Sequence, residues 1–274
     1  MTEDINSAVV TGAGSGIGRA LVAHLVATGV DVTAVDVDRE GLRSLGDELG
    51  AATAYADVAN RSGMDALAER IGAPDLLCLN AGITSSQALP VWSTPDDDWN
   101  RVLAVNLGGV RNGLTAFVPR LLATGRRHKV LITASLAGVA TWPGGGAYAA
   151  SKHAVVAIAE QAALSLIDTS VSVTLLCPAL VRSGMSPVGE DPATVAAAAL
   201  TACRHAQFAV IPDEWHAAVH ERATRLVAGA PPAVPQPSHA VGAADGSWAT
   251  GGGRSVHLPV SGAGPGRAGA RRGR

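Results

Sequence analysis

Two ionisable side chains four residues apart indicate where this chain could carry out proton chemistry. Tyr148 and Lys152 stand in the segment AYAASKHAVV, and the chain holds only 2 tyrosines. Two side chains at this spacing share one face of a helix, one turn apart. A tyrosine ordinarily loses its proton near pH 10, and a neighbouring ammonium group lowers that pKa by about one to three units. We therefore expect Lys152 to lower the pKa of Tyr148, so that its phenol serves a hydroxyl or carbonyl oxygen as acid and base.

A glycine-rich turn near the N-terminus predicts a site for a phosphate-containing ligand. The segment VVTGAGSGIG joins an apolar run to an amphipathic stretch that starts at Ile17. Glycines in such a turn let backbone amides approach a pyrophosphate, and the following helix N-terminus adds partial positive charge. Asp36 closes the next apolar run, where a carboxylate can accept hydrogen bonds from ribose hydroxyls.

Alternating short apolar runs and longer amphipathic stretches predict the elements that position these residues. The expected strands cover residues 7–12, 30–36, 75–82, 129–135 and 171–179, and the expected helices cover residues 17–29, 62–71, 99–122 and 147–167. Such alternation indicates a Rossmann-type α/β fold, a doubly wound parallel sheet flanked by helices. Ser135 ends one expected strand, and ligands bind at the carboxyl ends of strands in such sheets.

Composition bounds the domain organisation and the partners. We expect one domain over residues 1–229 and a disordered tail over 230–274, where glycine, proline and arginine are abundant and apolar side chains are few. A net charge of -2 predicts no nucleic-acid or membrane partner. The basic start and apolar core of a signal peptide are missing, and 3 cysteines are too few for a disulfide scaffold, which favours a cytoplasmic protein.

The spacing of the glycines departs from the general dinucleotide pattern, because Ile17 stands where G-x-G-x-x-G needs its third glycine. It fits T-G-x-x-x-G-x-G instead, with Thr11, Gly12, Gly16 and Gly18. Together with Tyr148, Lys152 and a serine before them, this pattern resembles the short-chain dehydrogenase/reductase family over about residues 8–229.

The resemblance implies a nicotinamide cofactor and a set of residues that hold it. LNAG resembles the family's N-N-A-G, with Leu79 in place of the first asparagine. CPALVRS resembles P-G-x-V-x-T, with Ala179 in place of the glycine. Because alanine resists positive φ, we expect the loop around Ala179 to be the part that departs from the family. The implied cofactor residues are Thr11, Gly12, Ser15, Gly16, Ile17, Gly18, Asp36, Asp57, Val58, Asn80, Ala81, Gly82, Tyr148, Lys152, Pro178, Val181 and Ser183. Neither Ser15 nor Val37 is basic, so we expect NAD rather than NADP, with Arg39 as the residue that could weaken this preference.

The implied reaction is hydride transfer between the cofactor and a secondary alcohol or ketone. The family's catalytic set corresponds to Asn106, Ser135, Tyr148 and Lys152, with Ser135 holding the substrate oxygen, Tyr148 transferring the proton, and Asn106 binding a water that links Lys152 to solvent. Leu136, Trp142 and Met185 are candidate substrate residues, with Trp92 a further one, and their apolar character favours an apolar or cyclic substrate. Arg182 could receive a charged group instead.

Two other functions remain open at this stage. The chain could be an NAD(H)-binding sensor without turnover, although the complete set of four predicted catalytic residues argues against it. It could also act like an epimerase or dehydratase, although those relatives need a larger C-terminal substrate domain. His216 and His220 have the spacing of metal ligands, but the absence of an evident third ligand favours a solvated helix face and no metal. We expect a homo-oligomer, a dimer or tetramer. Its subunit contacts should differ from those that the family's V-D-G-G strand makes, because this sequence has no such segment.

Overall fold

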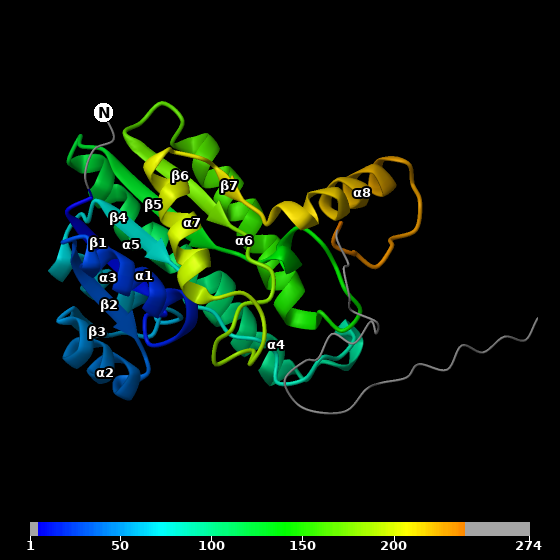
Figure 1. The fold of residues 1–274 in the computed structure, drawn as a ribbon, viewed down its shortest axis with the longest axis horizontal. Coiled ribbons are helices and arrows are strands. Elements are labelled where there is room, and N and C mark those ends of the chain that lie inside the picture. Colours follow the sequence, from blue (N-terminus) through cyan, green and yellow to red (C-terminus); the bar gives the residue numbers. More distant parts are fainter. Residues whose placement is uncertain (1–4, 239–274) are drawn as a thin grey trace, which may run out of the picture.

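Seven parallel strands form the centre of the protein, for which a computed structural model describes residues 5–238. Their order across the sheet is β3-β2-β1-β4-β5-β6-β7 (Figure 1). The bounds are β1 Ser7–Thr11, β2 Asp31–Asp36, β3 Ala52–Tyr55, β4 Leu76–Leu79, β5 His128–Thr133, β6 Val171–Leu176 and β7 Ala209–Val210. The chain order reverses between β1 and β4, so a crevice for ligands is expected at the carboxyl ends of these two strands.

Helices cover both faces of the sheet. One face packs against α1 (Gly16–Ala27), α2 (Arg39–Leu49) and α7 (Pro192–Arg204), and the other packs against α3 (Arg61–Ile71), α5 (Gly109–Ala123) and α6 (Gly146–Ser165). Two separate apolar cores fill these layers, which is why the central strands are apolar along nearly their whole length. The predicted doubly wound Rossmann-type fold is confirmed.

Capping residues explain where several helices begin and end. The carboxylate of Asp38 accepts a hydrogen bond from the backbone N–H of Glu40 at the start of α2, and Asp191 does the same for Ala193 at the start of α7. Gly50 ends α2 in the left-handed region at φ 68°. Neither α2 nor α7 was among the predicted helices, and β3 was not among the predicted strands.

The predicted helix over residues 99–122 is interrupted. The structure has α4 (Asp96–Leu103), a π-helical turn η2 (Ala104–Gly108) and then α5. Asn106 lies in this turn with none of its surface exposed. Such π turns often occur at functional sites because the extra residue redirects a side chain.

The chain after β7 forms the short turn η4 (Asp213–Trp215) and helix α8 (His216–Val227). Residues 230–238 were assigned by composition to the disordered tail, but in the structure they return to η4. Pro235 is buried, and the backbone N–H of Ser238 donates to the carbonyl of Glu214 at 2.7 Å. We call η4, α8 and residues 230–238 the C-terminal unit. The placement of these residues differs from the predicted tail because the backbone of η4 supplies an acceptor for them. The rest of the predicted tail, 239–274, lies outside the described residues.

Candidate active site

The predicted phosphate turn connects β1 to α1 at the carboxyl edge of the sheet. Gly12 and Gly16 have φ of 67° and 52°, values that favour glycine. A Cβ on Gly18 would lie 1.9 Å from the carbonyl oxygen of Gly12, so only glycine lets α1 approach the strand this closely. Ser15 and Ile17 stand at the start of α1, whose first backbone N–H groups lack partners within the helix. The turn therefore fits a pyrophosphate.

Side chains on β1 and after β4 hold this turn in place. The hydroxyl of Thr11 donates to the carbonyl of Cys78 at 3.2 Å and accepts from the backbone N–H groups of Asn80 and Ala81 at 2.9 and 3.2 Å. The Asn80 amide donates to the carbonyl oxygens of Thr11 and Gly12. A Cβ on Gly12 would lie 2.7 Å from the Cα of Ala81, so the two loops are in direct contact.

Asp36 lies beside the glycine turn. Its Oδ2 accepts from the backbone N–H of Gly14 at 2.8 Å, and its Oδ1 accepts from those of Val37 and Asp38 at 2.7 and 2.9 Å. The carboxylate is thereby oriented by three backbone donors. The guanidinium of Arg39 lies 4.0 Å above the ring centroid of Tyr55, which is the register partner of Asp36 on β3.

Two other predicted cofactor regions border the same edge. Asp57 is exposed and its carboxylate accepts from the backbone N–H of Ala59, whereas Val58 is buried and its carbonyl accepts from the side-chain amide of Asn112 at 2.9 Å. Asn112, which sequence reasoning missed, holds this loop to α5.

After β6, the loop of Pro178, Val181 and Ser183 returns to the glycine turn. A Cβ on Gly16 would lie 3.0 Å from the Cβ of Ser183. Ala179 is not among the described residues with positive φ, so the alanine that replaces the family's glycine does not strain this loop. Arg182 pairs with Asp191 at 3.6 Å, which leaves it less suited to a charged substrate.

The four predicted catalytic residues converge at the carboxyl ends of β4 and β5. Ser135 follows β5, and its hydroxyl interacts with Tyr148 on α6 closely enough to lower the pKa of that phenol. Lys152, only 3% exposed, donates from Nζ to the carbonyl of Thr133 at 3.1 Å and lies 5.8 Å from the Tyr148 ring centroid. A Cβ on Gly82 would lie 3.2 Å from Lys152 Nζ and 3.3 Å from the side-chain oxygen of Asn106, so the lysine and the asparagine flank one glycine.

The side chain of Asn106 makes three hydrogen bonds, which leave its oxygen one further lone pair. Its oxygen accepts from the backbone N–H of Ile83 at 2.8 Å, and its amide nitrogen donates to the carbonyl of Ile83 at 2.9 Å and to the hydroxyl of Ser151 at 3.0 Å. The Ser151 hydroxyl donates in turn to the carbonyl of Tyr148 at 2.7 Å. Ser151 was missed from the sequence, although it precedes the lysine on the same helix.

Burial dominates the protonation of the tyrosine and the lysine. Burial raises the pKa of Tyr148, with the Ser135 hydrogen bond acting in the opposite direction. Burial lowers the pKa of Lys152 to about 8. The expected lowering of the tyrosine pKa by the ammonium group is therefore not found, because loss of solvent disfavours both charged forms and the ammonium bonds the Thr133 carbonyl.

The structure brings together two of the candidate substrate residues. Leu136 and Trp142 belong to one apolar cluster beside Ser135. Met185 and Trp92 lie outside that cluster, and Trp92 is 84% exposed in the turn η1 (Val91–Ser93). The sequence could not reveal which apolar residues meet, because each lies on a different loop.

The predicted pair His216 and His220 has no third metal ligand beside it among residues 5–238, where no three His, Cys, Asp or Glu side chains are grouped so that they could hold a metal ion. The imidazole of His216 bonds to the carbonyl of Ile211 at 3.0 Å. Over the same residues, no helix has the length and apolar character needed to cross a membrane. A hollow of about 950 Å³ lies at the opposite edge of the sheet, near His128 and Ile167, and contains none of the predicted site residues.

Comparisons with known proteins agree with this arrangement. A family model described as short chain dehydrogenase matches residues 6–192. The chain is 38% identical over 190 residues to 1-deoxy-11-beta-hydroxypentalenate dehydrogenase of Streptomyces avermitilis, covering 66% of this chain and 70% of that protein. It is 34% identical over 181 residues to 3beta-hydroxysteroid dehydrogenase 2 of Eggerthella lenta, covering 63% and 69%.

A solved structure shows the same fold. The short-chain dehydrogenase/reductase of Burkholderia phymatum in complex with NAD superposes with a TM-score of 0.78 at 28% identity, covering 86% of this chain and 99% of that one. The fold and site define a dinucleotide-binding oxidoreductase. The chain belongs to the short-chain dehydrogenase/reductase family and is a dehydrogenase or ketoreductase that uses a nicotinamide cofactor and a small-molecule substrate.

Proposed function

We propose that this protein transfers a hydride between NAD and a secondary alcohol or ketone on an apolar, cyclic skeleton. The observation that supports it most strongly is the convergence of Ser135, Tyr148 and Lys152 beside the glycine turn of β1, at one edge of the sheet. The complete set of predicted catalytic side chains argues against a sensor without turnover.

The residues around the glycine turn fit the cofactor. Gly12, Gly16 and Gly18 leave room for a pyrophosphate against backbone amides, and Asp36 is oriented to accept from the ribose hydroxyls. The remaining predicted cofactor residues lie at the end of β1, at the start of α1 and on the loops after β3, β4 and β6: Thr11, Ser15, Ile17, Asp57, Val58, Asn80, Ala81, Gly82, Pro178, Val181 and Ser183. When bound, the nicotinamide accepts or supplies the hydride.

The chain itself moves the proton. In alcohol oxidation, the Tyr148 oxygen takes the hydroxyl proton while the Ser135 hydroxyl holds the substrate oxygen, and in reduction the tyrosine returns a proton to the carbonyl oxygen. Lys152 stabilises the phenolate by its positive charge, which requires that the lysine be protonated when the tyrosine is not. Asn106, next to Gly82 and Lys152, binds the water that connects the lysine to solvent.

The substrate class rests on the apolar residues beside Ser135 and on two relatives. Leu136 and Trp142 present hydrocarbon surface near the reacting oxygen, and the relatives described above are named for a hydroxypentalenate and a hydroxysteroid. Met185 is the third candidate, from the exposed loop after β6.

We place the protein in the cytoplasm as a homo-oligomer. All three cysteines, Cys78, Cys177 and Cys203, are free and buried, as suits a reducing compartment. The near-neutral charge favours neither nucleic acid nor membrane.

Replacement of Tyr148 by Phe tests the function. The ring still packs but no longer carries a proton, so turnover of cyclohexanol with NAD should fall at least about a thousandfold, within the range of general acid-base catalysis. NADH binding, measured by fluorescence titration, should change less than about threefold. Residual activity within tenfold of the wild type, or no wild-type activity on a panel of secondary alcohols with either cofactor, would contradict the proposal.

A further inference from the structure

A third apolar cluster connects the C-terminal unit to the catalytic loops. Leu136, Trp215 and Ala218 are its buried members, and Trp142 and Ala179 pack against them. Its buried members belong to neither of the two cores that flank the sheet, although Val139 and Ile211 pack against both this cluster and the core on the α3, α5 and α6 face. Trp215 is 5% exposed although it stands in a three-residue turn between β7 and α8. A large aromatic side chain buried outside both main cores contributes to a local contact rather than to the general packing of the sheet.

The partners of Trp215 come from the segments that carry the reaction. Leu136 follows Ser135 directly, and Trp142 lies on the loop that leads from there to Tyr148. Ala179 follows Pro178, whose carbonyl accepts from the backbone N–H of Leu136 at 2.8 Å. The cluster therefore contacts the loop after β5 and the loop after β6 together.

The two tryptophan rings meet edge to face. Their centroids are 5.6 Å apart at an interplanar angle of 76°, which is the favourable T-shaped geometry for aromatic pairs. A tryptophan side chain has only two rotatable bonds, so the contact with Trp215 restricts the orientation of the whole Trp142 ring.

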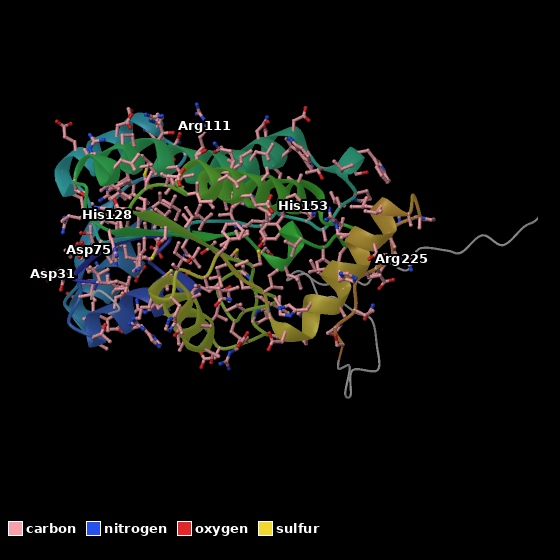
Figure 2. All side chains as sticks on the ribbon, turned by 90° about the horizontal axis from the view of Figure 1, so that it is seen from above. Asp31, Asp75, Arg111, His128, His153 and Arg225 are labelled. Carbon is pink, nitrogen blue, oxygen red and sulfur yellow. The ribbon has the colours of Figure 1, made fainter. Side chains whose placement is uncertain are left out.

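The C-terminal unit lies at the edge of the sheet where the site is. Figure 2 shows α8, marked by Arg225, at the far end of the molecule from Asp31, Asp75 and His128, which mark the amino-terminal ends of β2, β4 and β5. Two hydrogen bonds hold the segment after β7 together. The backbone N–H of Ser238 donates to the carbonyl of Glu214 in η4, and the His216 ring bonds to the carbonyl of Ile211 just before η4.

We propose that Trp215 determines substrate specificity by positioning Trp142 as a rigid apolar wall of the substrate site, which selects alcohols on fused or bulky rings over small acyclic ones. This inference rests on the proposed function. Trp215 acts through Trp142 and is a positioning residue, so its loss should weaken binding of large cyclic substrates while leaving the chemistry at Ser135 and Tyr148 intact.

The test compares two secondary alcohols, the bicyclic 1-decalol and the acyclic 2-butanol. Trp215→Ala should raise KM for 1-decalol about tenfold, with kcat within threefold of the wild type and kcat/KM for 2-butanol within threefold. Trp215→Phe keeps an aromatic edge and should restore KM for 1-decalol to within threefold. Leu226→Ala is the control, because this side chain lies on α8 but is 66% exposed, and it should change neither substrate's kinetics.

A purely structural role would give a different pattern. An equal loss of kcat/KM for both alcohols, or a Trp215→Ala protein with wild-type KM for 1-decalol, would overturn the inference. If Trp215→Ala does not fold, Trp215→Leu replaces it, because leucine fills apolar space without an aromatic edge, and the same outcomes apply.

A binding measurement separates this inference from the proposed function. Calorimetric titration of 1-decalone into the protein saturated with NADH should give a Kd about tenfold higher for Trp215→Ala than for the wild type. If neither alcohol is turned over, the proposed reaction fails, and this titration still decides the role of Trp215. An unchanged Kd, or no binding by the wild type, would overturn it.

Discussion

We propose that cofactor preference depends on the Asp36 carboxylate, which the backbone orients. Three backbone N–H groups, from Gly14, Val37 and Asp38, donate to Asp36 at 2.7 to 2.9 Å. Oδ1 accepts two of these bonds and Oδ2 accepts one, so Oδ2 keeps an acceptor site for a ribose hydroxyl. We predict that Asp36→Ala combined with Val37→Arg narrows or reverses a preference of the wild type for NAD.

The magnitude follows from the groups present. A charge-assisted hydrogen bond is worth about 1.5 to 3 kcal/mol, and NAD offers a ribose hydroxyl to the open acceptor site on Oδ2. NADP places a phosphate there instead, and two like charges about 4 Å apart repel by roughly 4 kcal/mol at an effective dielectric constant near 20, less where water screens them. Arg39 keeps its positive charge while it stacks on Tyr55, the register partner of Asp36, and so offsets part of this repulsion. A net discrimination of about 3 kcal/mol corresponds to roughly a hundredfold in kcat/KM.

The assay is kcat/KM for NAD and for NADP with one alcohol, in the wild type and the double variant. Asp38→Asn is the matched control: it removes the same charge two residues away, while asparagine can still accept from the Glu40 N–H at the start of α2. Its cofactor ratio should stay within fivefold of the wild type. A wild type that prefers NADP, or a double variant with an unchanged ratio, refutes the role given to Asp36.

Three further perturbations test the chemistry and the packing. Burial lowers the pKa of Lys152 from 10.5 to about 8, so between these pH values the unfolded chain binds more protons than the folded one. The free energy of unfolding should therefore rise with pH from 8 to 10.5, by up to about 3 kcal/mol. The Lys152→Met variant should lack this rise in urea titrations. Gly18→Ala would place a Cβ 1.9 Å from a backbone oxygen and should lower stability by at least about 3 kcal/mol, whereas Gly46→Ala in α2, with its nearest neighbour at 3.5 Å, should raise it by about 0.5 to 1 kcal/mol; equal effects in urea titration would contradict the packing argument. A chain ending at Ser238 should have the same melting temperature as the full-length protein. A chain ending at Gly229 should melt several degrees lower, because it lacks the buried Pro235 and the hydrogen bond of Ser238. Equal melting temperatures for the two shortened chains would show that residues 230–238 add no stability.

The sheet was predictable because strands buried on both faces leave a strong pattern. The runs that became β1, β2, β4, β5 and β6 are rich in Val, Leu, Ile and Ala, and their order with the intervening helices specifies parallel pairing. β3 gave no such signal, since it lies at the sheet edge and three of its four residues are exposed. α7 is rich in alanine, whose short side chain weakens the contrast between helix faces.

The site was predictable only where residue type and chain position both carry information. Strand ends place the glycine turn, Asp36 and Ser135 at one edge of the sheet, and helical spacing places Tyr148 and Lys152 on one face. The meeting of Trp142 with Trp215 could not be predicted, because it depends on how the chain after β7 turns back over the loop that follows β5.

The protonation of the site shows why positions alone were insufficient. From spacing, the ammonium of Lys152 should act on Tyr148 first, but the fold buries the lysine and gives it the Thr133 carbonyl as partner. Burial then disfavours both charges, so the free protein favours a neutral tyrosine and a lysine with a pKa near 8. Forming the phenolate thus requires the lysine to be protonated at that moment, which needs a route for protons. Asn106 lies in the π turn beside Gly82 and Lys152, where the interruption of the predicted helix places it, and the water that we propose it binds would provide this route.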